Sequence, residues 1–219
     1  EDMAVTISHE GYIKRNPVSL YRAQRRGGKG KIGTTTRDED FVEHLFIAST
    51  HSYILFFTTA GKAYWIKVHE VPQAGRAARG KAIVNLLDLK PDEKISAFLP
   101  VREFREHHFV FFATKQGVVK KTDLMAFANP RPSGIIAIGL DANDEVIGVR
   151  LTDGQQEVIL TTRDGQAIRF REEEVRSMGR GASGVKGITL EGNDEVVSLE
   201  ILSPGASVLT VAENGYGKR

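Results

Sequence analysis

The sequence predicts an all-β protein whose four-stranded units repeat about every 50 residues, and three observations indicate this fold class. An apolar run, a polar turn ending in glycine and a second run carrying Lys or Arg recur along the chain. The turn glycines lie at positions 11, 61, 117, 165 and 215, with spacings of 50, 56, 48 and 50 residues. No convincing helical period occurs, and residues 172–178 are long enough for one helical turn only. The pattern favours propeller-like blades over a helical solenoid.

Two further features recur with the same spacing as these turn glycines. A second glycine follows an arginine by four residues in three units (Arg26 to Gly30, Arg76 to Gly80 and Arg180 to Gly184), while the third unit offers Arg131 and Gly134. One strand later come the acidic pairs Asp38-Glu39, Asp92-Glu93, Asp144-Glu145 and Asp194-Glu195. A β-sandwich with decorated loops would explain the strands but not the phased glycines. We therefore expect one domain, 1–219, with repeats at about 4–48, 49–100, 101–151, 152–202 and a partial 203–219.

The strands follow from the repeat. Paired runs are expected at 4–14, 54–67, 109–120 and 158–169, with a fifth beginning at 208. In each pair a polar turn ending in glycine connects the two runs. Continuous apolar runs such as 53–57 predict inner strands buried by neighbouring blades. We accordingly expect Phe56, Phe57, Phe111 and Phe112 in the core rather than as stacking platforms for bases.

Composition narrows the classes of function. The 219 residues contain no cysteine, which excludes a disulfide framework and cysteine-based metal sites or nucleophiles. No apolar run approaches the roughly 18 residues of a membrane helix, and no signal-peptide pattern opens the chain. Both ends look cut from something larger. The six histidines form no metal-binding motif, and neither a nucleophile elbow nor an NTPase phosphate loop is present. We expect no catalytic site, metal or cofactor in this chain.

One stretch is strongly basic although the whole chain is only +2. Between Gly11 and Arg37 there are eight Lys or Arg residues and no acid, so the remainder sums to about −6 (2 minus 8). At its centre three cations and three glycines share seven consecutive positions: Gln24, Arg25, Arg26, Gly27, Gly28, Lys29 and Gly30. Glycines allow close backbone approach, and the amides and cations together suit a polyanion. We name residues 24–30 the basic box and expect it to bind DNA phosphates.

Cations elsewhere cluster at equivalent places in each unit, between the two glycines. If the blades are radial, these positions fall on one rim, and the acids occupy another edge. The rim contacts expected with lower priority than the basic box are Lys14, Arg15, Arg22, Lys31, Lys62, Lys67, Arg76, Arg79, Lys81, Lys120, Lys121, Arg131, Arg169, Arg171, Arg180 and Lys186. No recognition helix, zinc finger or basic zipper is apparent, so duplex DNA would be held by its phosphates, largely without sequence specificity.

The basic box, the Gly-Tyr-Ile-Lys at 11–14 and the repeat order together resemble the C-terminal domain of the bacterial DNA gyrase A protein. The resemblance covers essentially the whole chain, and the box matches at all seven positions. It implies a six-bladed β-pinwheel whose neighbouring blades exchange strands. Such a domain wraps duplex DNA around its rim and presents a positive crossing for strand passage, which yields negative supercoils.

The resemblance also implies a parent enzyme, its partners and its location in the cell. The parent enzyme would be a type IIA topoisomerase that uses ATP and Mg²⁺ at sites elsewhere in the holoenzyme. The expected partners are double-stranded DNA, the N-terminal part of the same gyrase A polypeptide and the gyrase B protein of an A₂B₂ assembly, in the bacterial cytoplasm at the nucleoid and not at a membrane. Four full repeats and part of a fifth are present, so the expected ring is incomplete.

Three alternatives remain open. Topoisomerase IV has a similar domain with a degenerate or missing box, so an intact box favours gyrase. A protein-interaction propeller would explain the blades and the acidic turns but not eight cations without an acid. A propeller enzyme would need convergent polar groups near a central channel, which the sequence does not display.

Overall fold

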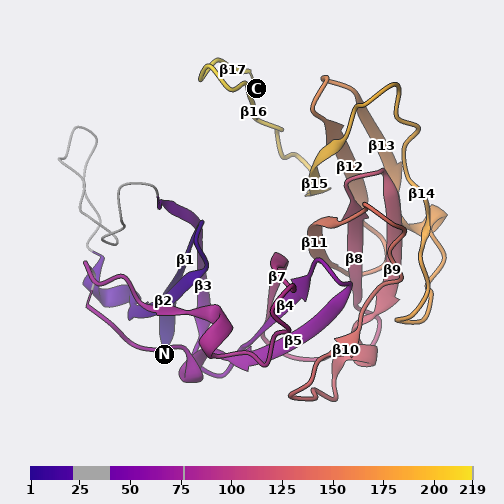
Figure 1. Cartoon of the computed structure of the whole chain (residues 1–219). Coiled ribbons are helices and arrows are strands. Elements are labelled where there is room, and N and C mark those ends of the chain that lie inside the picture. Colours follow the sequence, from indigo (N-terminus) through magenta and orange to yellow (C-terminus); the bar gives the residue numbers. More distant parts are fainter. Residues whose placement is uncertain (22–39, 76, 219) are drawn as a thin grey trace.

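The computed structural model describes residues 1–21, 40–75 and 77–218. Within them the chain is all-β, and four small antiparallel sheets follow one another in an open arc (Figure 1). The sheets are the blades that the repeat predicts. The predicted fold class is confirmed.

Each blade is numbered by its place along the chain. The first blade has the order β3 (Val42–Ser49), β1 (Asp2–Ser8), β2 (Tyr12–Pro17) and β6 (Lys81–Ala82). The second blade has the order β7 (Ile95–Val101), β4 (Tyr53–Thr58), β5 (Lys62–Lys67) and β10 (Ile135–Ile136).

The third blade has the order β11 (Val146–Thr152), β8 (Phe109–Thr114), β9 (Val118–Asp123) and β14 (Val185–Lys186). The fourth is three-stranded, with β15 (Val196–Leu202), β12 (Glu157–Thr162) and β13 (Ala167–Arg171). A last hairpin joins β16 (Thr210–Val211) to β17 (Gly217–Lys218). The helical elements of the described part are short 3-10 turns: η1 (Val18–Leu20), η2 (Val68–Glu70), η3 (Ile83–Asn85), η4 (Leu124–Phe127) and η5 (Glu172–Glu174).

Neighbouring blades exchange a strand. The two-residue strands β6, β10 and β14 each come from the repeat after the one that forms the rest of their blade. They pair with β2, β5 and β9, so they form the outer edge of the first three blades. At the inner edge β7 lies beside β11 and β11 beside β15, while Phe98 of β7 packs on Phe46 of β3 with ring centroids 5.0 Å apart. The exchanged strands therefore line the convex side of the arc.

One turn geometry recurs at the end of β1, β4, β8 and β12. A Ser or Thr there accepts a hydrogen bond on its backbone oxygen from the glycine three residues later, and its hydroxyl oxygen accepts one from the next amide. The five predicted turn glycines all have positive φ, between 72° and 90°. Leucine, valine or any other side chain would be strained there, which is why the glycines mark the repeat.

The core lies between the blades. Phe56, Phe57, Phe111 and Phe112 are fully or almost fully buried, as predicted, and Phe57 meets Phe112 edge to face across the second and third blades. Three apolar clusters fill the spaces between consecutive blades. The runs predicted as inner strands, such as Tyr53–Thr58, are central strands buried on both faces rather than the innermost ones.

One acid of each acidic turn holds an equivalent place, and in three of the four turns it belongs to the predicted pair. Asp40, Glu93, Asp144 and Asp194 are equivalent, because each lies two residues before the residue that pairs with the Ser or Thr of the turn. The carboxylates of Asp40, Asp144 and Asp194 accept hydrogen bonds from backbone amides of the turn. Asp40 therefore takes this role in the first blade, and the predicted pair Asp38-Glu39 lies outside the described residues.

Candidate nucleic-acid interface

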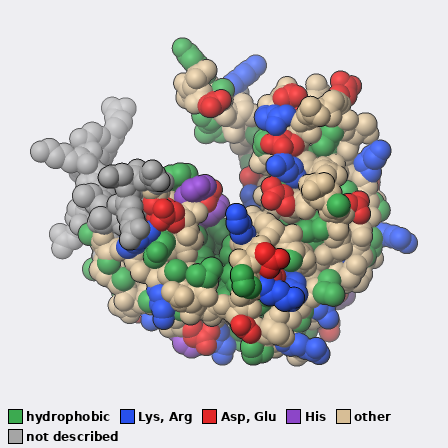
Figure 2. All heavy atoms as spheres, in the orientation of Figure 1, with side chains coloured by type: hydrophobic (Ala, Val, Ile, Leu, Met, Phe, Trp, Pro, Cys, Tyr) green, Lys and Arg blue, Asp and Glu red, His purple; other side chains and the backbone are tan. Residues whose placement is uncertain are grey.

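Two of the three exchanged strands, β6 and β14, carry cations to the convex edge of the blades. Lys81 lies on β6 and Lys186 on β14, and both are exposed. Lys62, the half-buried first residue of β5, pairs directly with Ile136 of the exchanged strand β10. In Figure 2, Lys and Arg side chains protrude from the outer margin of the arc. The exchanged strands of the first and third blades, and β5 beside the exchanged strand of the second, thus place positive charge along the convex edge.

The remaining described rim cations differ in exposure. Lys67, Arg131, Arg169 and Arg171 are exposed, whereas Arg15, Arg79 and Arg180 are half-buried. Phosphate contact requires accessible charge. The four exposed cations, together with Lys81 and Lys186, are therefore the better candidates for contacts with phosphates.

Arg79 is held in place beside the exchanged strand. Its guanidinium lies 3.5 Å above the ring centroid of Tyr12 and is paired with the carboxylate of Glu10. Stacking and pairing together fix the planar group at the edge of the first blade. Arg169 likewise pairs with Glu157. Acids therefore lie among the rim cations, and the predicted separation of acidic and basic edges is incomplete.

Three cations predicted for the rim lie inside the molecule. Lys14 and Lys120 have no exposed surface and Lys121 is 7% exposed. The Lys14 amine donates hydrogen bonds to the backbone oxygens of Gly75 and Ala78, and the Lys121 amine to that of Glu172 at 2.9 Å. The expectation that these lysines face outward is corrected: their amines bind backbone carbonyls between blades, and sequence alternation alone does not reveal this.

Arg15 is also used between blades. Its guanidinium donates to the backbone oxygens of Val71 and His69, at 2.7 and 3.2 Å. Trp65 occupies the equivalent place in the second blade, and its indole nitrogen donates to the backbone oxygen of Phe127 at 3.0 Å. A side chain of one blade therefore caps the 3-10 turn region of the next.

Several predicted contacts lie outside the described residues. They are the whole basic box, Gln24, Arg25, Arg26, Gly27, Gly28, Lys29 and Gly30, together with Arg22, Lys31 and Arg76. The sequence nevertheless places the box at the same point of its repeat as residues 74–80 and 178–184, because Gly30, Gly80 and Gly184 share one position.

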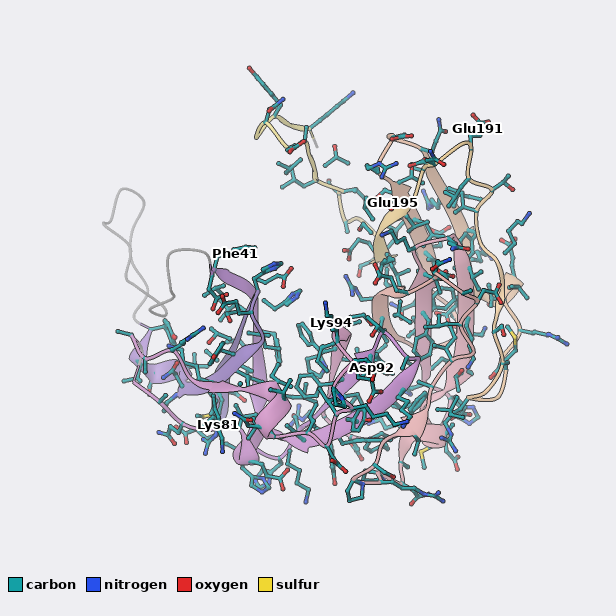
Figure 3. All side chains as sticks on the ribbon, in the orientation of Figure 1. Phe41, Lys81, Asp92, Lys94, Glu191 and Glu195 are labelled. Atoms are coloured by element: carbon teal, nitrogen blue, oxygen red, sulfur yellow. The ribbon has the colours of Figure 1, made fainter. Side chains whose placement is uncertain are left out.

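The concave side has a different character. Figure 3 shows Lys94 pointing into the hollow between the first and fourth blades, with Glu195 on the blade edge that borders it, whereas Lys81 lies on the opposite side of its blade. Figure 2 shows this hollow on the molecular surface. The charged rim and the hollow are therefore separate surfaces.

Two negative findings apply to residues 1–21, 40–75 and 77–218. No group of three or more His, Asp or Glu side chains there could hold a metal ion. None of the helical turns in that part is long and apolar enough to cross a membrane.

Comparison with known proteins identifies the repeat. A family model described as the DNA gyrase C-terminal domain, beta-propeller, matches residues 2–49, 52–102, 108–153 and 156–203. The DNA gyrase A protein of Salmonella typhimurium is 53% identical over all 219 residues, and that of Escherichia coli is 50% identical over the same length. The chain spans 25% of each of these relatives.

Two solved structures have the same fold. A DNA gyrase A C-terminal domain superposes with a TM-score of 0.82 at 26% identity, covering 99% of this chain and 70% of that one. The C-terminal domain of a DNA topoisomerase IV superposes with a TM-score of 0.78 at 32% identity, covering 100% and 67%. With four matched repeats and about half of all residues identical to gyrase A proteins, the chain belongs to the family of DNA gyrase A C-terminal β-propeller domains.

Proposed function

We propose that this chain binds duplex DNA along its convex rim and wraps it, without reading base sequence and without catalysing a reaction itself. The observation that carries the proposal is the placement of exposed Lys81 and Lys186 on the exchanged strands of the first and third blades, with Lys62 beside the exchanged strand of the second blade. A curved row of cations matches a duplex backbone held by its phosphates. Bending the duplex over the arc would select deformable sequences rather than particular bases.

The basic box is the proposed anchor of the wrapped segment. Arg25, Arg26 and Lys29 would contact phosphates, and the glycines would permit close approach of the backbone. Gln24 would shape the loop or donate one hydrogen bond. Lys67, Arg131, Arg171 and their neighbours on later blades would extend the contact. This assignment rests on the sequence of residues 24–30 and on the equivalent loops of the second and fourth repeats.

In the whole enzyme we infer that the wrapped DNA is presented as a positive crossing, so that ATP-dependent strand passage introduces negative supercoils. The proposed partners are the N-terminal part of the same gyrase A polypeptide and the gyrase B protein of an A₂B₂ assembly, in the cytoplasm of a bacterium. ATP and Mg²⁺ would act at sites outside this chain. The intact box and the 53% identity over all 219 residues to a gyrase A protein favour this assignment over a topoisomerase IV-type domain.

Salt dependence tests the binding proposal. A rim making about 6–10 phosphate contacts should lose about 10³–10⁵ in affinity for a linear duplex between 50 and 200 mM salt. Replacing Arg25, Arg26 and Lys29 by alanine should flatten that dependence, while an equal number of substitutions at Lys90, Lys94 and Arg102 serves as a charge-matched control. Salt-insensitive binding, or an equal effect of both triple variants, would contradict the proposal and favour a protein-interaction propeller.

A further inference from the structure

Two buried lysines occupy the same register position in different blades. Lys14 lies opposite Thr6 in the first blade, and Lys120 lies opposite Phe112 in the third. Each side chain reaches into the loop that leads to the next exchanged strand. The Lys14 amine donates to the backbone oxygens of Gly75 and Ala78, at 3.3 and 2.7 Å. The Lys120 amine donates to the backbone oxygens of Ala137, at 2.7 Å, and Arg180.

The loops held by these lysines have little stiffness of their own. Apart from their arginines, residues 74–80 contain only Ala and Gly, and residues 178–184 are Gly, Ala and Ser after Met178. Such segments have large backbone freedom to lose when they become ordered. An amine fixed on a strand and bound to loop carbonyls removes that freedom. The carbonyl of Arg180 is thereby held inward, and the guanidinium of the same residue lies at the surface against the backbone oxygen of Ile136.

The second blade holds its incoming loop differently. Tyr64 takes the register position of the lysines, opposite Phe56, and its ring lies directly under Gly134 of the incoming loop. Here the loop carries Pro130 and Pro132 around Arg131, and each proline ring fixes one φ angle. A loop stiffened by its own prolines does not depend on an amine for its shape. Lysine thus accompanies the two loops rich in Gly and Ala, and tyrosine accompanies the loop that contains two prolines.

We propose that Lys14 and Lys120 are positioning residues for DNA binding, whose amines hold the backbone at Gly75, Ala78 and Arg180 so that Arg79 and Arg180 face the phosphates. The inference rests on the proposed function and adds a specific role to residues that never touch DNA. The loops presented in this way carry Arg79 before Lys81, and Arg180 before Lys186.

The environment of Lys120 agrees with this geometry. Burial, with the charge of Arg180 as a smaller cause, lowers the pKa of Lys120 to about 8. The amine therefore stays charged at neutral pH and adds its charge directly behind the rim. Burial likewise lowers the pKa of Lys14.

The test uses the full-length gyrase A protein carrying Lys120→Met, which keeps the length of the side chain and removes the amine. Lys121→Met is the matched control, because it also removes a buried lysine amine between the third and fourth blades, but one bound to Glu172 outside loop 178–184. Affinity for a linear duplex is measured across salt concentrations. We expect Lys120→Met to reduce the slope of log affinity against log salt by about 1–2, and Lys121→Met to leave it unchanged.

A double-mutant cycle separates positioning from general stability. If Lys120 acts through Arg180, then Arg180→Ala and Lys120→Met together should weaken binding little more than Arg180→Ala alone. Equal slopes for wild type and Lys120→Met, or fully additive effects in the cycle, would overturn the inference. Should Lys120→Met not fold, Lys14→Met with Arg79→Ala makes the same comparison on loop 74–80. Absence of salt-sensitive binding by the wild type would instead overturn the proposed function itself.

Discussion

The interface between the first and second blades and the interface between the second and third blades perform the same strand exchange with different side chains. In the former, Lys14 and Arg15 bind backbone oxygens of the incoming segment. In the latter, Tyr64 and Trp65 take those places, with the Tyr64 hydroxyl bound to Glu93 and the Trp65 indole to Phe127. The interface between the third and fourth blades returns to lysines, Lys120 and Lys121. At the position of Arg15, Trp65 and Lys121 each blade thus supplies a donor to the next repeat, as a cation or an indole, whereas Tyr64 donates within its own repeat.

The largest expected effect is the loss of stability when a methyl group is added to a single glycine at the strand exchange. A methyl group on Gly184 (φ 95°) would come within 2.4 Å of the backbone oxygen of Val119, whereas one on Gly134 (φ 73°) would meet the Tyr64 ring at 2.7 Å. Backbone cannot move aside without displacing β14, so Gly184→Ala should cost about 3–5 kcal/mol in urea unfolding and Gly134→Ala about 1–3 kcal/mol.

Gly165→Ala is the control that measures the cost of a side chain at positive φ without a steric clash. The φ of Gly165 is 90°, and no heavy atom lies within 4 Å of the added methyl group. This substitution should cost only about 1–2 kcal/mol. Equal losses for Gly184→Ala and Gly165→Ala would show that the close approach at the exchanged strand does not limit stability.

The second prediction concerns the interface between the third and fourth blades, where Lys120 makes the free energy of unfolding depend on pH. Because the folded pKa of Lys120 is about 8 and the ordinary value is 10.5, the unfolded chain binds more protons in that window, and stability rises with pH there. The free energy of unfolding of the wild type relative to Lys120→Met should increase by about 1–3 kcal/mol between pH 8 and 10. A flat difference across this range, measured by denaturant unfolding, would indicate that the amine is not held in a low-polarity environment.

The smallest expected effect concerns the fourth blade. Arg169 has the register position of Arg15 and Lys121, but its side chain is 62% exposed and paired with Glu157. Solvent screening leaves such a surface pair worth little, so Arg169→Ala should change stability by less than about 0.5 kcal/mol. Arg15→Ala, which frees two backbone oxygens between blades, should cost about 1–3 kcal/mol by the same denaturant titration. Similar losses for the two variants would contradict the view that the incoming segment gives this position its importance.

The sequence predicted the repeat well because its markers are local. A turn glycine with positive φ and a buried phenylalanine run each depend on neighbours a few residues away, so Gly61 and Phe57 could be placed from pattern alone. The strand exchange and the all-β class followed from the resemblance and the spacing. The acidic turns were predicted as Asp-Glu pairs, whereas one acid per turn holds the equivalent place. The carboxylate of Asp144 accepts a hydrogen bond from a backbone amide, whereas the longer side chain of Glu93 accepts from two hydroxyl groups.

The candidate site was harder to predict, since a lysine has the same sequence signal whether it faces water or a carbonyl. Lys120 binds the carbonyl of a residue 60 positions later, and no local pattern encodes that contact. Lys81 and Lys186, in contrast, follow the second glycine of their repeats within two residues and lie on edge strands, and exposure there follows from topology. The contacts assigned to the basic box remain a prediction, because residues 24–30 lie outside the described part of the chain.

The most direct test of DNA wrapping is the linking number of a nicked circular plasmid resealed by ligase with this chain bound. We predict a shift in linking number that is lost when residues 24–30 are replaced by alanine and kept when Lys90, Lys94 and Arg102 are replaced. An unchanged linking number with the natural sequence, at protein concentrations where the plasmid is saturated, would contradict DNA wrapping and leave a domain that holds DNA without curving it.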